Sequence, residues 1–281
     1  MSMFWLDATE VEGTLYLIGK VELGEGTGVF GSVCVVVHNV QRSLLVLPRR
    51  LPGDEAFCEE SLFSPGLRYG KTGEVSGANG SFEDPVHGEI SSLLVPSVIP
   101  RSHEGEKFRA KPVARRYAFE HTDVPRDPTT YLKVKYSARY PPPPLAACES
   151  GGKSFQRIFG ARTSAVENFL LKRRLMGPCW LTVRAPVVPV SPCSWCRVEV
   201  TVEDPKKIAA APAPFPPAPP VVTLSLSLKT VVHPSTHANE IVAMAAVVHR
   251  EAKLDHPTED SGPAAAAKMT GWAAVRPLGA A

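Results

Sequence analysis

Two pairs of potential metal ligands lie in the last third of the chain. Cys193 and Cys196 form a C-x-x-C pair, and His233 and His237 follow, so that a Cys2His2 zinc site can be drawn. The gap between the pairs is too long for a compact zinc finger, and a proline-rich tract lies inside it. The C-x-x-C pair also falls in a predicted strand, where its odd spacing directs the two sulfurs to opposite faces. We therefore expect two small apolar cysteines around a core Trp195, and neither a zinc site nor a redox thiol pair.

Other patterns with catalytic potential are incomplete. The segment Gly66-Leu-Arg-Tyr-Gly70-Lys71-Thr72 resembles a phosphate-binding loop, but three residues separate its glycines where four are required. The chain contains no G-x-S-x-G motif, and its eight histidines are scattered without a context that marks one of them as a general base. The sequence therefore gives no support for nucleophilic catalysis.

Two runs of basic residues could contact phosphate groups. The run at 107–116 is interleaved with Phe108 and followed by Tyr117, and basic residues mixed with aromatic ones are typical of a groove that binds a nucleic-acid strand. The run at 172–174 ends a predicted helix, where cations also stabilise the helix dipole without any ligand. A solvated surface helix explains either run as well. The candidate nucleic-acid-binding residues are Lys111, Arg115, Arg116, Lys172, Arg173 and Arg174.

The composition sets broad limits on the class of protein. The 281 residues are 44% hydrophobic and 21% charged, which suits one large or two ordinary globular domains. The net charge of +3 is mildly basic and does not by itself indicate nucleic-acid binding. The N-terminal MSMFWLDATE lacks the features of a signal peptide, and no segment reaches the ~18 apolar residues of a membrane span. We therefore expect an intracellular protein with no membrane partner, whose six cysteines are free thiols.

Short apolar runs predict a β-rich domain over residues 1–208. Residues 3–50 predict a meander of antiparallel strands that RSLLVLPRR completes, and another strand is expected at 131–138. The segment 107–120 suits either a helix or an extended strand. Residues 52–106 are rich in Gly and Ser and show no sustained period, so we expect a long loop or a misjoined insert there.

One helix has clear start and stop signals. Ser164 is a plausible N-cap, Glu167 completes a capping box, and Gly177-Pro178 is expected to end the helix. The segments CWLTVRAP and SWCRVEVTVED predict two more strands after it. Strands in excess of helices favour an α+β fold.

The composition changes sharply after residue 208. The tract PAPFPPAPP makes residues 209–220 a stiff, polyproline-like linker, since proline lacks the donor that helices and central strands require. Residues 221–249 predict two buried strands joined by a polar loop. Residues 257–281 lack a core pattern and are expected to form an irregular tail.

Several blocks of this chain follow one another in the order and approximate spacing of a known family. The blocks are FWLDA (4–8), LPR (47–49), KPVARRYAFE (111–120), YLKVKYSA (131–138), FGARTSAVENFLLKRRLMGPCWL (159–181), SWCRVEV (194–200) and LKTVVHPSTHANEIVAMAAVVH (228–249). With these blocks the chain resembles the catalytic subunits of replicative family B DNA polymerases. The resemblance fails in about 60–106 and after about 256.

The resemblance implies two structural units. Residues 1–208 would be the β-rich, mixed N-terminal domain of the polymerase. Residues 221–256 would open the exonuclease-like domain, a truncated ribonuclease-H-like fold. Its orphaned strands have lost most of their sheet, so we expect them to be poorly ordered or prone to aggregation.

The resemblance also identifies two positions of a degenerate metal site. Proofreading relatives carry Asp-x-Glu on the first exonuclease strand, and Ser227 and Lys229 occupy the corresponding positions here. A hydroxyl and an ammonium cannot replace two carboxylates that bind divalent cations. We therefore expect no catalytic residues and no metal in this chain.

The implied function is that of part of a polymerase. The parent would extend RNA primers with DNA at replication initiation, using Mg2+, in the nucleus. Its partners would be DNA, the RNA-DNA primer-template, primase and accessory subunits. The palm motifs Y-G-D-T-D-S and D-x-x-S-L-Y-P-S are not found in this sequence, so we expect a role in scaffolding and nucleic-acid binding only. The alternative is a self-standing, non-catalytic protein that binds DNA or a partner with the same N-terminal domain.

Overall fold

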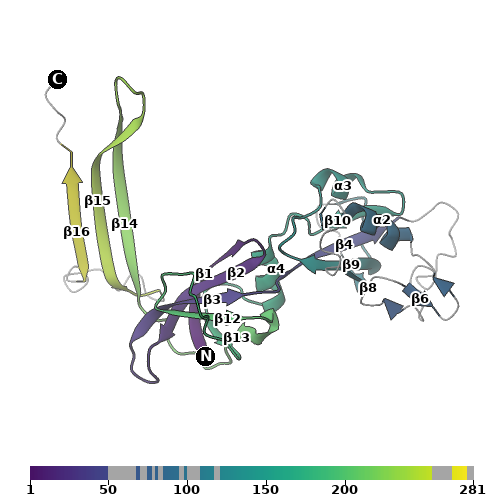
Figure 1. Cartoon of the computed structure of the whole chain (residues 1–281), viewed down its shortest axis with the longest axis horizontal. Coiled ribbons are helices and arrows are strands. Elements are labelled where there is room, and N and C mark those ends of the chain that lie inside the picture. Colours follow the sequence, from purple (N-terminus) through teal and green to yellow (C-terminus); the bar gives the residue numbers. More distant parts are fainter. Residues whose placement is uncertain are drawn as a thin grey trace.

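The molecule is elongated and is built mainly from β-sheets (Figure 1). The computed structural model describes residues 1–49, 68–69, 75–77, 80–81, 85–94, 98–99, 108–116, 121–254 and 268–276. Within these residues, a six-stranded first sheet lies beside a four-stranded second sheet, and a three-stranded third sheet projects away from both. No helix in the described ranges is long and apolar enough to cross a membrane.

The first sheet combines both ends of the 1–208 segment. Its strand order is β12-β3-β2-β1-β11-β13, and all neighbours are antiparallel except β12 and β3, which are parallel. The strands are β1 (Ser2–Val11), β2 (Thr14–Glu22), β3 (Phe30–Val37), β11 (Trp180–Val183), β12 (Val198–Val202) and β13 (Ile208–Ala210).

Local sequence explains the first hairpin of this sheet. Apolar residues alternate with more exposed ones along β2, so that Leu15 and Leu17 face the core. The hairpin turns at Glu12 and Gly13, both with positive φ, as a two-residue hairpin loop requires. A side chain at Gly13 would also meet the backbone nitrogen of Arg139 at 2.2 Å, so glycine is required there on two counts.

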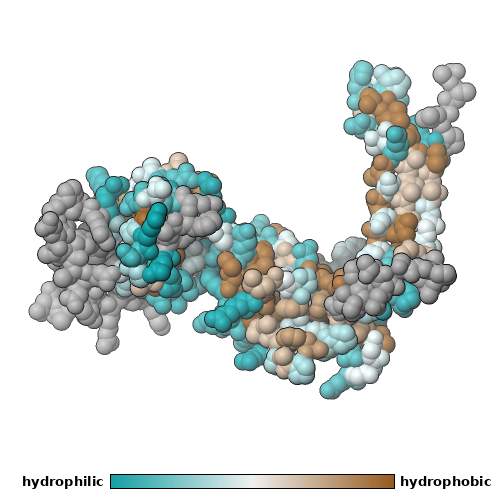
Figure 2. All heavy atoms as spheres, turned by 180° about the vertical axis from the view of Figure 1, so that it is seen from behind, coloured by the Kyte–Doolittle hydropathy of each residue, from teal (hydrophilic) through white to brown (hydrophobic). Residues whose placement is uncertain are grey.

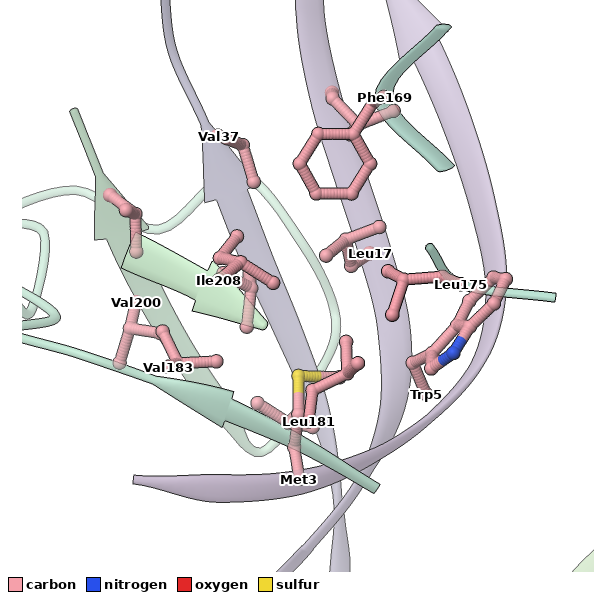
Figure 3. Packing of buried hydrophobic residues seen from close by; sticks show 14 of the residues in the cluster. Met3, Trp5, Leu17, Val37, Phe169, Leu175, Leu181, Val183, Val200 and Ile208 are labelled. Atoms are coloured by element: carbon pink, nitrogen blue, oxygen red, sulfur yellow. The ribbon is translucent and has the colours of Figure 1, made fainter. Parts of the chain in front are cut away.

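A single apolar cluster fills the inner side of the first sheet (Figure 3). Met3, Leu17 and Leu181 come from neighbouring strands and are fully buried. Phe169 and Leu175, from a helix and the residues after it, close the cluster on one side. The core therefore joins residues from the two ends of the domain.

The helix in this cluster is α4 (Ala165–Arg173). The predicted capping box is confirmed, because Ser164 accepts from the Glu167 backbone and the Glu167 carboxylate accepts from the Ser164 backbone. The predicted stop at Gly177-Pro178 is wrong. The helix ends earlier because Arg174 adopts a left-handed conformation and its N–H returns to the Leu170 and Leu171 carbonyls.

The second sheet has the order β10-β4-β9-β8, all antiparallel. One of its faces packs on two helices and shares with them a cluster that includes Leu44, Ile90 and Leu132. The elements are β4 (Gln41–Pro48), α2 (Pro85–Leu94), β8 (Arg109–Arg115), β9 (Thr129–Ser137), α3 (Leu145–Ser150) and β10 (Phe155–Phe159).

The second sheet corrects two predictions and decides one open alternative. Strand β4 does not complete the N-terminal meander. Instead, Asn39 takes a positive φ after β3 and the chain enters the second sheet, where Leu44 and Val46 are buried. The 107–120 segment is a strand, β8, as far as it is described. The 52–106 segment is not a loop throughout, because α2 lies in it and buries Val86, Ile90 and Leu94 in the second core.

The rest of 52–106 lies largely outside the described residues. The short strands β5 (Arg68–Tyr69), β6 (Val75–Gly77) and β7 (Gly80–Ser81) form a small sheet. The loop resembling a phosphate-binding motif is described only at β5.

The third sheet has the order β14-β15-β16. Its strands are β14 (Val221–Val232), β15 (Asn239–Ala252) and β16 (Met269–Val275). The predicted pair of strands in 221–249 is present as the hairpin β14-β15, but it is not buried: all of β14 after Val221 is exposed. The tail was expected to be irregular, yet β16 pairs with β15 over seven residues.

The proline-rich tract is anchored at several points. Strand β13 pairs with β11 through Ala209 and Ala210, so the tract begins inside the first sheet. Farther along, the Trp180 Nε1 donates to the carbonyl of Pro216 at 2.9 Å. The 3-10 helix η2 (Pro205–Lys207) precedes β13.

Candidate nucleic-acid interface

One face of the second sheet gathers cations from distant parts of the chain. Strand β8 pairs with β9 so that Arg109 lies opposite Lys135 and Lys111 lies opposite Lys133. Directly opposite residues of an antiparallel pair project from the same face of the sheet. The apolar cluster shared with α2 and α3 occupies the other face. The four cations therefore lie together on the opposite face, beside the small apolar cluster that Leu47, Val124 and Tyr131 form there.

Helix α4 brings a fifth cation to this face. The Lys172 ammonium donates to the carbonyl of Gln41, at the start of β4, over 3.3 Å. The residue as a whole is exposed, but its ammonium group lies against the sheet at this carbonyl, so burial acts on the charged end of the side chain. We call Arg109, Lys111, Lys133, Lys135 and Lys172 together the basic face.

The lysines of the basic face repel one another. Burial, and then the charges of Lys135 and Lys133, lower the pKa of Lys172 to about 8. Burial and the charge of Lys135 also lower the pKa of Lys133, and burial and the charge of Lys111 lower the pKa of Lys135. Arg115, Arg173 and Lys206 contribute further positive charge to these three lysines. Each lowered pKa means that the folded protein holds these protons less tightly than a free lysine would.

No carboxylate compensates this charge among the residues that the structure describes. The ion pairs found there join Arg157 to Asp123, Arg162 to Glu149, Lys268 to Glu251 and Arg276 to Glu240, all outside the basic face. A surface that concentrates cations without acidic partners attracts anions, and phosphate groups above all. The arrangement is suited to holding a polyanion.

Aromatic residues lie in the same row of the sheet as two of the lysines. Phe159 of β10 lies opposite Leu45, which lies opposite Lys133. His121 packs on Phe159 with ring centroids 5.6 Å apart. Phe159 also packs on the buried Tyr131, so only part of its ring is accessible beside the lysines. Basic and aromatic residues side by side are the two components of a strand-binding surface.

The structure brings together only part of the predicted basic set. Lys111 and Lys172 lie on the basic face, and Arg115 and Arg173 act on its lysines. Arg116 follows the end of β8, and Arg174 is the C-cap of α4. Lys107 and Tyr117 lie outside the described residues.

Two members of the basic face, Lys133 and Lys135, were not predicted. Arg109 lies in the predicted run 107–116 but was not among the candidate binding residues. A signal for the two lysines was present, since Lys133 and Lys135 alternate with apolar residues in YLKVKYSA and must therefore share one face of a strand. What the sequence did not reveal was which strand would lie opposite.

The two residues predicted to occupy degenerate exonuclease positions lie on the third sheet. Ser227 and Lys229 occupy β14, opposite Ala245 and Ala243 of β15. In the described parts of the chain, no three His, Cys, Asp or Glu side chains come close enough to hold a metal ion. A hydroxyl, an ammonium and two methyl groups do not fit a divalent cation, so these positions support no metal-dependent reaction step.

The C-x-x-C pair lies in a loop and not in a strand. The buried carboxylate of Glu199 accepts hydrogen bonds from the backbone of Cys193 at 2.9 Å and of Ser194 at 2.8 Å, and these bonds hold the loop before β12 begins. Trp195, predicted to be a core residue, is fully exposed at the end of this loop. The prediction failed because the strand starts only at Val198.

The thiolate form is disfavoured at two cysteines near this loop. Burial raises the pKa of Cys34 to about 11, and burial and a hydrogen bond with Glu199 raise the pKa of Cys193. The five described cysteines are free, as predicted for them, while Cys58 lies outside the described residues.

Comparison with known proteins shows which class of protein this chain is similar to. Residues 156–264 match the exonuclease domain of family B DNA polymerases. The fold is shared with the family B DNA polymerase from the hyperthermophilic archaeon Pyrobaculum calidifontis, with a TM-score of 0.50 over 88% of this chain and 25% of that one, at 16% identity. The resemblance to the family B DNA polymerases is therefore confirmed.

Within that class, the chain is similar to the catalytic subunit of DNA polymerase alpha. It is 38% identical to that subunit of Xenopus laevis over 90% of its own length, and 34% identical to that of Arabidopsis thaliana over 92%. It covers only 16% and 17% of these two relatives. The chain thus corresponds to about a sixth of the full subunits.

The exonuclease match starts well before the predicted domain boundary. It begins at residue 156 and so includes α4, β11, β12 and β13, which were predicted to belong to the N-terminal domain. In the structure these elements belong to the first sheet and its core. The domain limits at 208 and 221 stay a prediction.

Proposed function

We propose that this chain is a non-catalytic, nucleic-acid-binding part of an alpha-type DNA polymerase catalytic subunit. The basic face carries the proposal, because five cations converge there and no described carboxylate neutralises them. Its ligand would be the sugar-phosphate backbone of DNA or of an RNA-DNA primer-template.

The spacing of the cations supports this ligand. Along each strand, residues on one face repeat every ~6.6 Å, and opposite strands lie ~4.8 Å apart. Arg109 with Lys135 and Lys111 with Lys133 therefore form two rows that can each take one phosphate group of a single strand. Lys172 adds a third contact beside the Lys135 row.

The proposed binding role does not require catalytic residues in this chain. Ser227 and Lys229 leave no carboxylate at the expected exonuclease metal positions, so the chain would neither degrade nor extend DNA. Mg2+, primase and accessory subunits would be partners of the longer polymerase, and its work would lie in the nucleus.

A binding measurement with matched variants tests the basic face. The affinity for a labelled primer-template is followed by fluorescence anisotropy across a range of salt concentrations. In the double variant Lys133→Gln/Lys135→Gln, two phosphate contacts are lost, so the slope of log K against log salt should become shallower by about 1.4 to 1.8.

The control removes the same charge elsewhere. Lys20→Gln/Lys229→Gln changes residues of the first and third sheets and should leave the slope close to that of the wild type. Equal losses in both double variants would show a diffuse charge effect and would exclude this face as the interface.

A further inference from the structure

Helix α4 places one lysine at the end of the basic face. The Lys172 ammonium donates a hydrogen bond to the carbonyl of Gln41 over 3.3 Å. Gln41 lies opposite Ser137, which follows Lys135 by two residues on β9. The carbonyl that holds the ammonium therefore lies ~6.6 Å along the strands from the row of Lys135. A helix and two strands together fix the position of this charge.

The surroundings of the Lys172 ammonium are positively charged. The charges that act on it are those of Lys135 and Lys133 on β9 and of Arg173 on α4 itself. Helix α4 also packs against β1, β4 and β13, and none of these strands adds a described charge to that set. The partner on β4 is a neutral carbonyl. In the part of the chain that the structure describes, this lysine therefore meets cations and no carboxylate.

Lys172 holds its proton weakly in this position. Burial against the sheet, and then the charges of Lys135 and Lys133, lower its pKa to about 8. About half of the free molecules therefore lack this proton at pH 8, and about one in ten lacks it at pH 7. A neutral amine has no charge with which to hold a phosphate group, so these molecules lack one contact of the basic face.

A phosphate group beside Lys172 would change this balance. An anion within ~4–6 Å favours the charged form of an amine and so raises its pKa. The proton and the phosphate each favour the binding of the other, and such a coupling is reciprocal. Because the pKa is higher in the complex than in the free chain, binding is strongest below about pH 8 and weakens as the pH rises above this value.

We propose that a nucleic acid bound to the basic face is held in part by a proton that Lys172 takes up on binding. This inference rests on the proposed function, because it concerns the same face and the same ligand. Hydrophilic residues cover much of the second sheet in the view of Figure 2, whereas hydrophobic ones line the third sheet. The affinity should respond to pH between 7 and 9, a range in which an ordinary lysine stays almost fully charged.

Calorimetry of the full chain with the labelled primer-template measures the proton directly. Titrations at pH 8 in Tris and in Hepes, two buffers that differ in their enthalpy of ionisation, give the number of protons taken up. The wild type should take up about 0.5 proton per complex, the fraction that free Lys172 lacks at this pH. Its affinity, followed by fluorescence anisotropy, should fall about threefold between pH 7 and pH 8.5.

Lys172→Arg separates the proton from the charge, because an arginine stays charged throughout this range. Its affinity at pH 7, where most wild-type Lys172 is also charged, should be within about twofold of that of the wild type. The uptake at pH 8 and the decline between pH 7 and pH 8.5 should both be lost. Lys20→Arg makes the same substitution on the first sheet and should behave as the wild type. Far-UV circular dichroism checks that both variants are folded.

The other outcomes overturn the inference in different ways. A wild type that binds the primer-template without proton uptake leaves the proposed function standing and contradicts the coupling. Uptake that persists in Lys172→Arg assigns the proton to another group, and its loss in Lys133→Arg or Lys135→Arg would place that group on β9. A wild type that does not bind the primer-template at pH 7 contradicts the proposed function, and the coupling with it.

Discussion

The second and third sheets are built from similar alternating strands but bury them differently. In the second sheet, Leu132 and Val134 face the α2 and α3 helices, while Lys133 and Lys135 face outward. In the third sheet, Leu224 and its neighbours have the same alternation, but none of the helices that the structure describes packs against them. Alternation in sequence therefore specifies that a sheet has two faces, and only the elements around it decide whether the apolar face becomes a core.

The largest difference in stability is expected between two variants that each shorten a leucine, one in the second sheet and one in the third. Leu132→Ala leaves a cavity in a closed core and should lower the free energy of unfolding by about 2–5 kcal/mol. Leu226→Ala, where the side chain is half exposed, should cost less than ~1 kcal/mol in the monomer. Urea unfolding of the two variants at low protein concentration measures both values.

Equal losses in that experiment would break the comparison. They would mean that Leu226 is as well buried in solution as Leu132.

A smaller effect is expected at the helix that joins the two larger sheets. Ser164→Ala removes the side-chain acceptor of the α4 capping box and should destabilise the protein by about 1 kcal/mol. Because Lys172 is near the other end of α4, the variant should also weaken DNA binding slightly. Thermal unfolding and the anisotropy assay check the two effects.

Thr163→Ala is the control for this variant, because the Thr163 hydroxyl is next to Ser164 in sequence but takes no part in the capping box. A comparable loss for Thr163→Ala would show that the effect comes from the loop and not from the cap.

The smallest effect concerns the charge of Lys172. Its pKa is about 8 in the folded protein and near 10.5 when unfolded, so the unfolded chain binds more protons between these values. Stability therefore rises with pH across this window, because loss of the proton removes first the cost of burying the ammonium and then its repulsion by Lys135 and Lys133. Both effects are fully present below pH 8. Lys172→Met should raise stability at pH 7 by a few tenths of a kcal/mol, as expected for removing a like-charge contact.

Urea unfolding at pH 7 and pH 9.5 measures this difference. The advantage of Lys172→Met over the wild type should shrink at the higher pH. An advantage that is constant with pH would assign the effect to packing of the methionine.

Local elements were largely predictable from the sequence, and their partners were not. The strand at YLKVKYSA and the Ser164–Glu167 capping box depend on neighbours within a few residues, and both were found. The position of β4 in the second sheet depends on strands β9 and β10, which lie about a hundred residues away in sequence. No local pattern contains that information.

The same distinction applies to the candidate site. The basic run at β8 was recognisable, but the basic face exists because β8 pairs with β9 in one register and because α4 turns Lys172 onto it. Trp195 was misplaced for a similar reason, since the Glu199 carboxylate that fixes its loop is a tertiary feature of the first sheet. The sequence therefore identifies which residues could bind a ligand, but not which of them the fold brings together.

The connectivity of the first sheet has a consequence for how the chain is made. The Met1 ammonium donates to the carbonyl of Val183, β1 pairs with β11, and β3 pairs in parallel with β12. At about 5–20 residues per second, a ribosome needs roughly 10 to 30 seconds between finishing β3 and delivering its partner. Throughout that interval the apolar edge of the nascent hairpins lacks the strands that complete it, so synthesis of this chain places a sustained demand on ribosome-associated chaperones.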